Sequence, residues 1–178
     1  ANSVLPTITG TAKVGQVLTA NEGTWSPTTT NYGYQWMWAS TSTGIYANID
    51  TATAKTYTVD GAYSGKYLKV VVTARVVGYS DGQATSAATA AVAAGTFTSA
   101  VPTITGTAAV GATLTANTGT WTPTPNFSFQ WQSATVSTGP FLPVSGATST
   151  TYTLQLTDQG KFFRFMETGT LTGYTSVT

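Results

Sequence analysis

The sequence predicts an all-β protein built from two copies of one β-sandwich, and three observations support this fold class. Residues 5–12 return as residues 101–108 with only the first position changed, so one unit is written twice. Short runs rich in β-branched and aromatic residues alternate with glycine and proline in both copies. No segment shows the apolar spacing of an amphipathic helix.

The repeat extends well beyond its first eight residues and suggests the domain boundaries. Trp36 and Trp131 each follow an aromatic residue and a glutamine, and each lies 21 residues before a tyrosine. The loops between the matched points therefore kept their length along with the core. We expect one domain over residues 1–94 and a second over residues 95–178, joined by a short linker at residues 93–99.

About seven strands are expected in each copy, because turn residues interrupt the β-rich runs at short intervals. Apolar and polar residues alternate along part of the longest runs, which is typical of strands with one buried face. In the first copy the strands are predicted at residues 4–9, 16–20, 31–38, 45–49, 56–59, 66–77 and 83–92. Seven short strands separated by turns indicate a two-sheet sandwich.

The second copy lacks a counterpart of the last of these strands. Residues 78–79 match residues 173–174, which places Thr178 opposite Gln83, at the start of the segment expected to form the final strand. Without that strand, the preceding strand would carry unpaired N–H and C=O groups along one edge.

The predicted strand-addition edge consists of Lys161, Phe163, Phe165 and Glu167. An unpaired edge of this kind is a template for an added strand. Two explanations stay open at this point. The missing strand belongs to a longer chain, or another subunit donates it, for example through an extended segment such as residues 1–5.

The composition argues against several classes of function. The chain has no histidine and no cysteine, which removes the commonest metal ligands, the thiol nucleophile and the usual general base. Charged residues make up 7% and the net charge is +1, so the basic surface of a nucleic-acid-binding protein is missing. No apolar run has the length of a membrane span. We therefore expect no enzyme, no cofactor, no metal, no nucleic-acid partner and no membrane span.

Read in order, the matched motifs are Pro-Thr-Ile-x-Gly-Thr-Ala, Val-Gly-x-x-Leu-Thr-Ala, Gly-Thr-Trp, aromatic-Gln-Trp, Thr-Tyr-Thr, Gly-Lys and Gly-Tyr. This series covers nearly the whole chain and resembles the tandem immunoglobulin-like repeat domains of bacterial surface proteins and of tailed-phage structural proteins. The resemblance implies two tandem immunoglobulin-like β-sandwiches of about seven strands each, with Trp36 and Trp131 packed between the sheets. It implies binding, spacing or assembly, and no catalysis.

Three further tryptophans are candidates for contact with a ligand or partner. Trp25 and Trp121 follow the same Gly-Thr turn. They either close one end of each sandwich or expose an indole on which a sugar could stack. Trp38 is matched by Ser133, so the fold does not require a tryptophan there, and its ring serves either as a surface contact or as extra core.

The charged residues favour a solvated face over an active site. Lys66 and Lys69 recur as Lys161 and Arg164 and are expected to point outward. Glu167 differs, because it replaces a valine at an inward position of its strand. A carboxylate there needs a partner, unless the register shifts or the strand leaves one face open.

The sequence thus predicts a non-catalytic structural or adhesion module: a spacer, decoration or assembly unit of an extracellular surface protein, a filament or a virion. Its expected partners are neighbouring repeats or subunits of the same assembly, with surface glycans as a second possibility. The alternative function is a carbohydrate-binding module that uses exposed aromatic residues. Sequence alone leaves open the choice between a cell surface and a phage particle, and the identity of any ligand.

Overall fold

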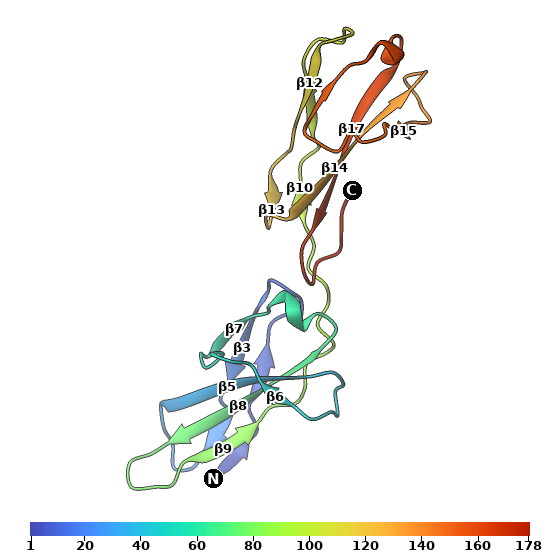
Figure 1. Ribbon diagram of the computed structural model, residues 1–178. Coiled ribbons are helices and arrows are strands. Elements are labelled where there is room, and N and C mark those ends of the chain that lie inside the picture. The colour runs from blue at the N-terminus through green and yellow to red at the C-terminus, as the bar shows by residue number, and fades with distance from the viewer. The chain divides into compact units, whose positions relative to one another are not determined.

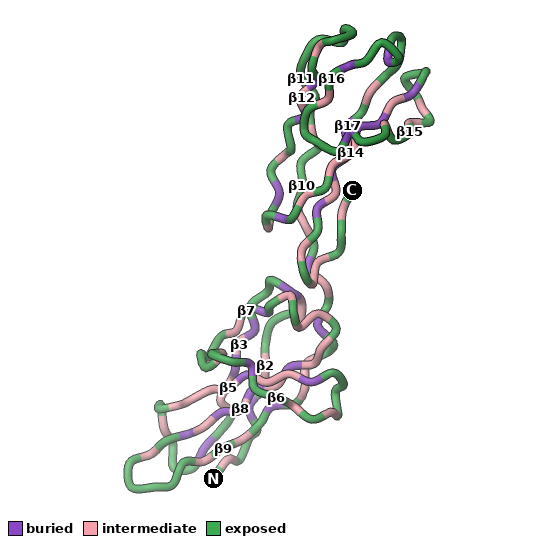
Figure 2. The backbone as a smooth tube through the Cα atoms, in the orientation of Figure 1, coloured by how far each residue is buried: buried purple, intermediate pink, exposed green.

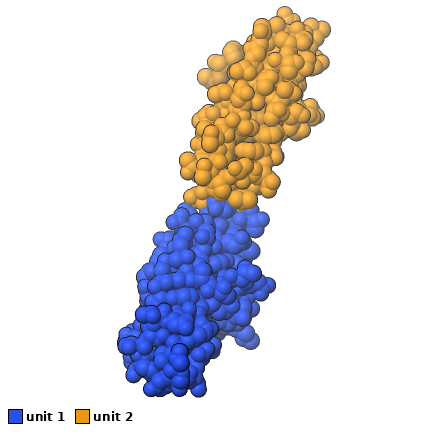
Figure 3. Space-filling model, turned by 90° about the vertical axis from the view of Figure 1, so that its left-hand side faces the viewer, with its two compact units in different colours: residues 1–95, 172–174 blue, residues 96–171, 175–178 orange.

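The computed structural model describes residues 1–178 and is all-β, with antiparallel sheets and two short 3-10 helices (Figure 1). The chain divides into two compact units (Figure 3). Unit 1 comprises Ala1–Gly95 and Thr172–Tyr174, and unit 2 comprises Thr96–Leu171 and Thr175–Thr178. None of the helices has the length and apolar character needed to cross a membrane.

Unit 1 contains two main antiparallel sheets and a two-stranded ribbon. One sheet has the order β2 (Thr7–Thr9), β3 (Val17–Asn21), β7 (Thr56–Thr58). The other has the order β6 (Ala47–Asn48), β5 (Asn31–Ala39), β8 (Tyr67–Arg75), β9 (Gly82–Thr85). The ribbon pairs β1 (Asn2–Val4) with β4 (Thr24–Trp25), and a 3-10 helix spans Gly61–Tyr63.

Unit 2 repeats this plan with one strand fewer. One sheet has the order β11 (Thr103–Thr105), β12 (Thr113–Asn117), β16 (Thr151–Thr153). The other has the order β15 (Leu142–Pro143), β14 (Asn126–Ala134), β17 (Phe162–Thr170). The ribbon pairs β10 (Thr98–Ser99) with β13 (Trp121–Thr122), and a 3-10 helix spans Leu156–Asp158.

Both sheets of each unit contribute to its core, as expected for a β-sandwich. In β8 every second side chain is buried, because successive residues of a strand point to opposite faces (Figure 2). Its inward residues meet Leu18 of β3 and Trp36 of β5 in one apolar cluster. The cluster of unit 1 has twelve buried members, whereas that of unit 2 has six.

The aromatic-Gln-Trp motif builds the centre of each unit. Trp36 and Trp131 are 0% exposed, and their indole N–H groups donate to the backbone oxygens of Ala54 (3.0 Å) and Ser149 (2.9 Å). Burial of the ring therefore leaves no unpaired donor.

The glutamine before each tryptophan bonds the backbone of its own sheet. The Gln35 amide donates to the backbone oxygens of Trp36 (2.8 Å) and Ile49 (2.9 Å). The Gln130 amide makes the matching bonds to Trp131 and Val144, both 2.8 Å. The repeated glutamine thus has a structural role in both units.

The predicted strands at residues 16–20, 31–38, 56–59 and 66–77 correspond to β3, β5, β7 and β8. Of the predicted strand at residues 4–9, only residues 7–9 form β2, while Val4 ends β1, which belongs to a different sheet. The short strands β4 and β13 were not predicted. The segment at residues 83–92 is regular only as far as Thr85 and continues as an irregular run held by backbone bonds.

Candidate functional site

The clearest difference between the two units lies at the outer edge of the last long strand. In unit 1, β9 pairs with β8, and the irregular segment that follows it continues along the same edge of β8 (Figure 1). Backbone N–H groups of the segment donate to β8 and the residue before it: Ser86 to Val70 (3.0 Å), Thr89 to Leu68 (2.9 Å) and Val92 to Lys66 (2.8 Å). Residues 82–93 therefore cover this edge completely.

Side chains of the same segment also bond the edge of β8. The backbone N–H of Val70 donates to the Ser86 hydroxyl (3.0 Å), and that of Leu68 donates to the Thr89 hydroxyl (3.0 Å). Ser86 and Val92 are themselves buried, at 4% and 2% exposure. The segment thus satisfies the edge of β8 and also fills part of the core.

The equivalent edge of β17 is unpaired over most of its length. Trp131 of β14 uses its backbone N–H and C=O on Ala147 and Val144, on the side away from β17. In an antiparallel pair its partner Phe165 then points its own N–H and C=O to the outer edge. No residue of the chain bonds them there. Pairing begins only at Gly169, which exchanges two backbone bonds with Val177 (2.9 and 3.3 Å).

The residues of the predicted strand-addition edge all match residues of unit 1 that lie beside the covering segment. Lys161, Phe163, Phe165 and Glu167 match Lys66, Leu68, Val70 and Val72, which face the covering segment in unit 1. Phe163, Phe165 and Glu167 lie on β17, and Lys161 directly precedes this strand. The structure also leaves the apolar core less covered there, since Phe165 is 8% exposed whereas Val70 is fully buried.

Glu167 lies at this edge and points inward, as its position in the strand predicted. Its side chain is 3% exposed, and the register is unshifted: Glu167 pairs with Phe129 as Val72 pairs with Tyr34. One carboxylate oxygen, Oε1, accepts a hydrogen bond from Nε1 of Trp121 at 2.8 Å. The other, Oε2, is buried with no hydrogen-bond partner. The partner that a buried carboxylate was expected to need is therefore the Trp121 indole, and it bonds only one of the two carboxylate oxygens.

A groove of about 380 Å³ runs beside Glu167 within unit 2. Its lining residues include Ala100, Trp121, Arg164, Phe165, Met166 and Glu167. The walls are mostly apolar, and the carboxylate is the buried polar group among them. The groove thus combines an unpaired strand edge, apolar surface and one buried acceptor.

Trp25 and Trp121 are 5% and 7% exposed, so the alternative in which their indoles form an exposed stacking platform was wrong. Each ring packs against a glycine of a strand: a Cβ on Gly82 would lie 2.9 Å from Trp25, and one on Gly169 would lie 2.6 Å from Trp121. The side chains face inward because the short strands β4 and β13 turn them toward the sandwich. Both tryptophans close an end of their unit.

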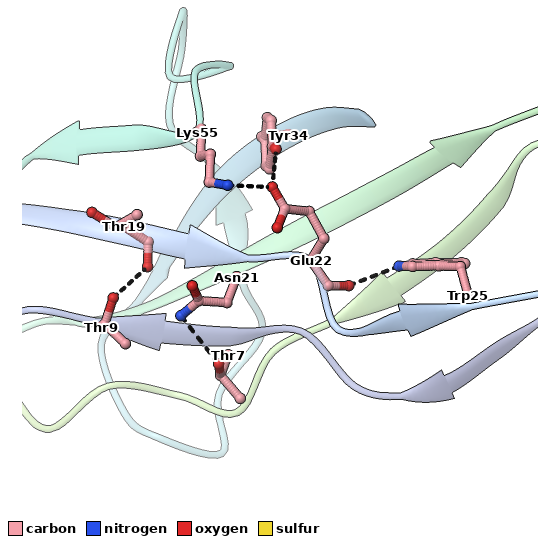
Figure 4. A network of polar contacts seen from close by, with 8 residues as sticks. All are labelled: Thr7, Thr9, Thr19, Asn21, Glu22, Trp25, Tyr34 and Lys55. Carbon is pink, nitrogen blue, oxygen red and sulfur yellow. Dashed lines mark hydrogen bonds and ion pairs between the residues drawn. The ribbon is translucent and has the colours of Figure 1, made fainter. Parts of the chain in front are cut away.

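The two indoles reach different acceptors. Trp25 Nε1 donates to the backbone oxygen of Glu22 at 2.7 Å, and the Glu22 carboxylate accepts from the Tyr34 hydroxyl (2.6 Å) and pairs with Lys55 (2.7 Å) (Figure 4). In the second copy, Thr118, Phe129 and Thr150 stand at the positions of Glu22, Tyr34 and Lys55. The whole network is lost together, and Trp121 turns to Glu167 instead.

Sequence reasoning missed the network around Glu22, although the repeat carries a signal for it. The carboxylate, the ammonium and the phenol hydroxyl of this network are all absent from the second copy, while a carboxylate appears at the position of Val72. Such concerted changes indicate residues that contact one another. In this chain the changes accompany two different acceptors for the matched indoles of Trp25 and Trp121.

Trp38 is half-buried and stacks against the fold. Its ring centroid lies 5.8 Å from that of Tyr63, and the ammonium of Lys66 lies 5.6 Å from the ring. In unit 2 the matching positions hold Ser133, Asp158 and Lys161, of which the last two form an ion pair at 3.5 Å. An aromatic cluster that includes Trp38 in unit 1 is thus replaced by an ion pair in unit 2. Trp38 as a whole remains partly exposed.

The repeated basic residues lie over aromatic rings. The Lys69 ammonium is 4.4 Å from the Tyr46 ring, and the Arg164 guanidinium is 4.8 Å from the Phe141 ring at the matching place. Arg164 also donates to the Gln132 side chain at 2.6 Å. These cation–π contacts explain why a positive charge recurs there. The structure contains no group of three or more acidic, histidine or cysteine side chains that could hold a metal.

Asp158 gives unit 2 a dependence on pH. Burial disfavours the charge of this carboxyl, but hydrogen bonds from the backbone N–H of Gln155, from Tyr152 and from Lys161 outweigh burial, so the pKa falls below its ordinary value of 3.8. A lowered folded-state pKa adds stability that is fully present above about pH 4 and is lost as the pH falls through the folded pKa. We expect Asp158→Asn to weaken this acid dependence in urea unfolding of unit 2.

The matched control for this prediction is Glu22→Gln in unit 1. The pKa of Glu22 is also lowered, because hydrogen bonds from Lys55 and Tyr34 outweigh the opposing effect of burial. Each substitution should change the acid dependence of its own unit only. A uniform change in both units would contradict the assignment.

Comparison with protein-family models found no match, and comparison with the curated proteins found no relative.

Proposed function

We propose that this chain is a non-catalytic structural or adhesion module, a spacer, decoration or assembly unit of an extracellular surface protein, a filament or a virion. In this proposal it consists of two tandem immunoglobulin-like sandwiches. The observation that carries it is the nature of the residues that the two copies share. Trp36, Gln35 and Trp25 are matched in unit 2 and have packing or backbone-bonding roles in both units.

The residues that differ between the copies support the same proposal. The Glu22 network and the Trp38 cluster are each exchanged in unit 2 for a different arrangement that still closes the fold. Selection on a ligand site would favour a shared set of accessible polar or aromatic groups. Here the shared tryptophans are buried, and the shared cations Lys69 and Arg164 contact an aromatic ring of their own unit, whereas the Glu22 network and the Trp38 cluster vary. Such a pattern is expected of a repeated scaffold whose value lies in its shape and its length.

A low density of charge fits this role. With a net charge of +1 and 7% charged residues, contact with a neighbouring subunit would rest on backbone edges, hydroxyl groups and aromatic rings. Contacts of this kind depend weakly on salt. The partners in this proposal are neighbouring repeats or subunits of the same assembly.

The carbohydrate-binding alternative makes a different prediction, and a glycan array separates the two. Two of the three candidate tryptophans are buried, so Trp38 is the remaining aromatic platform among them. We expect residues 1–178 to bind no glycan selectively. Selective binding that disappears in Trp38→Ser would overturn the proposal and support a carbohydrate-binding module. Serine is chosen as the replacement because unit 2 carries it at the matching position, 133.

A further inference from the structure

We infer that the outer face of the three-stranded sheet in each unit binds ice, through a regular array of threonine side chains. We call this array the hydroxyl face of the unit. In unit 1 it consists of Thr7, Thr9, Val17, Thr19, Asn21, Thr56 and Thr58. In unit 2 it consists of Thr103, Thr105, Thr113, Thr115, Asn117, Thr151 and Thr153. The inference goes beyond the proposed function, because it names a binding surface and its partner.

The alternation of each strand turns these side chains away from the core. In β3, Leu18 and Ala20 are fully buried, so Val17 and Thr19 point to the opposite face of the sheet. In β7, Tyr57 packs against the core cluster, and the threonines on either side of it are exposed. The matching strands of unit 2 repeat both patterns.

Strand pairing places the threonines in rows. Thr19 pairs with Thr9 on one side and with Thr56 on the other, which gives a row of three threonines across three strands. The same row occurs at the matching positions of unit 2. Neighbouring strands lie about 4.8 Å apart and rise about 3.3 Å per residue, so the array repeats at about 4.8 Å in one direction and about 6.6 Å in the other.

Hydrogen bonds within the face hold several of these side chains in place. The Thr9 hydroxyl donates to the backbone oxygen of Thr19 (3.4 Å), and the Asn21 amide donates to the Thr7 hydroxyl (3.4 Å) (Figure 4). The matching bonds in unit 2 are 3.3 and 3.5 Å long. Because threonine is also stiff at its first side-chain torsion, the face presents its hydroxyl and methyl groups in a fixed arrangement.

The hydroxyl face is nearly identical in the two units, whereas the outer face of the other sheet is not. Only Val17 differs, and its counterpart Thr113 has almost the same shape. On the outer face of β5 and β8, Met37, Tyr67 and Val71 are replaced in unit 2 by glutamine, phenylalanine and methionine. A high β-propensity does not explain the choice of threonine, since valine, isoleucine and tyrosine share it.

The chemistry of the face favours neither a nucleic acid, a sugar nor a protein as its partner. None of its residues is charged or aromatic, so it offers no cation to a phosphate and no ring on which a sugar could stack. The array spans roughly 10 by 13 Å, which is several times less than the about 800 Å² that each partner buries in a stable protein complex.

Ice matches what the face does offer. Each threonine presents a methyl group beside a hydroxyl, and the hydroxyl both donates hydrogen bonds to water and accepts them from it. The hexagonal lattice of ice repeats at distances close to the two spacings of the array. Waters bonded to successive threonines therefore lie near the positions of a lattice plane. A crystal surface presents this pattern everywhere, so a small face is sufficient for adsorption.

The test is the incorporation of residues 1–178 into slowly growing ice. Ice excludes solutes that do not bind it, so we expect the protein to be enriched in the ice fraction. The double variant Thr19→Lys/Thr115→Lys places a long charged side chain at the centre of each array. We expect this variant to stay in the liquid, with its ice fraction reduced to that of a protein that does not bind ice.

The matched control is the double variant Thr73→Lys/Thr168→Lys. These two threonines also correspond between the units, are also partly exposed, and point outward from the other sheet. The control should enter ice as the unchanged protein does. If the lysine variants do not fold, Thr9→Ala/Thr105→Ala removes one hydroxyl from each array without adding charge, and it should lower the ice fraction.

The remaining outcomes contradict the inference. Exclusion of the unchanged protein from ice would overturn it and leave the proposed structural role as it stands. An equal loss in the control would show that the hydroxyl face is not the site. Binding to insoluble cellulose or chitin that requires Thr19 and Thr115, without entry into ice, would make a polysaccharide surface the partner instead.

Discussion

Replacement of Trp36 or Trp131 by alanine is expected to destabilise the unit that contains it by about 3–5 kcal/mol, on the scale of large-to-small core substitutions. Both side chains are 0% exposed. Each ring packs beside a tyrosine, with centroids 5.7 Å apart for Trp36 and Tyr57 and 6.1 Å apart for Trp131 and Tyr152. Removal of the ring also leaves a backbone oxygen without its indole donor.

The measurement is urea unfolding of the whole chain. Amide hydrogen exchange is the probe that assigns the loss of stability to one unit or the other. Trp38→Ala is the matched control. That ring sits two residues further along the same strand, is half-buried, and stands where unit 2 manages with serine. A loss from Trp38→Ala as large as that from Trp36→Ala would contradict the central role of Trp36.

The all-β class and the buried strands were predictable because the repeat shows which residues are kept in both copies. A residue kept in both copies at the same spacing is under a constraint that both folds share. Trp36 and Trp131 met that criterion together with the glutamine before them, and the alternating run of β8 showed which of its faces is inward. The inward position of Glu167 followed from the same alternation and is confirmed.

The irregular parts of the edges were less predictable. The strands β4 and β13 have two residues each and no periodicity that a sequence could show. The split of residues 4–9 depends on two different neighbouring strands, β4 and β3. Residues 86–93 lack strand geometry but still bond β8, partly through the hydroxyl groups of Ser86 and Thr89. Local sequence does not encode the partner of a backbone group.

The candidate site combined a predictable feature with an unpredictable one. The unpaired edge at Lys161, Phe163, Phe165 and Glu167 followed from alignment of the two copies. The bond from Trp121 to Glu167 did not, because 46 residues separate the donor from the acceptor. The identity of that acceptor depends on how β13 turns the indole. Only the simultaneous loss of the Glu22 network from unit 2 pointed to it.

Gly10 and Gly106 are expected to tolerate no side chain, and alanine at either should cost about 2–4 kcal/mol in its own unit. Their φ angles are +107° and +119°, a region that strains residues with a Cβ. A Cβ on Gly10 would lie 2.5 Å from the backbone oxygen of Val17, and one on Gly106 would lie 2.6 Å from that of Thr113. Both clashes are with backbone at the start of β3 or β12, which cannot move without loss of pairing.

Gly65→Ala separates the two causes, since Gly65 has a φ of +75° but open space where the Cβ would lie. That substitution carries the conformational strain alone and should cost about 1–2 kcal/mol. Thermal unfolding of the three variants gives the comparison. If Gly10→Ala and Gly106→Ala cost no more than Gly65→Ala, the approach of the turn to the next strand is not what keeps a glycine in both copies. If they cost clearly more, the Pro-Thr-Ile-Thr-Gly motif persists because its glycine lets the turn pack directly on the strand it pairs with.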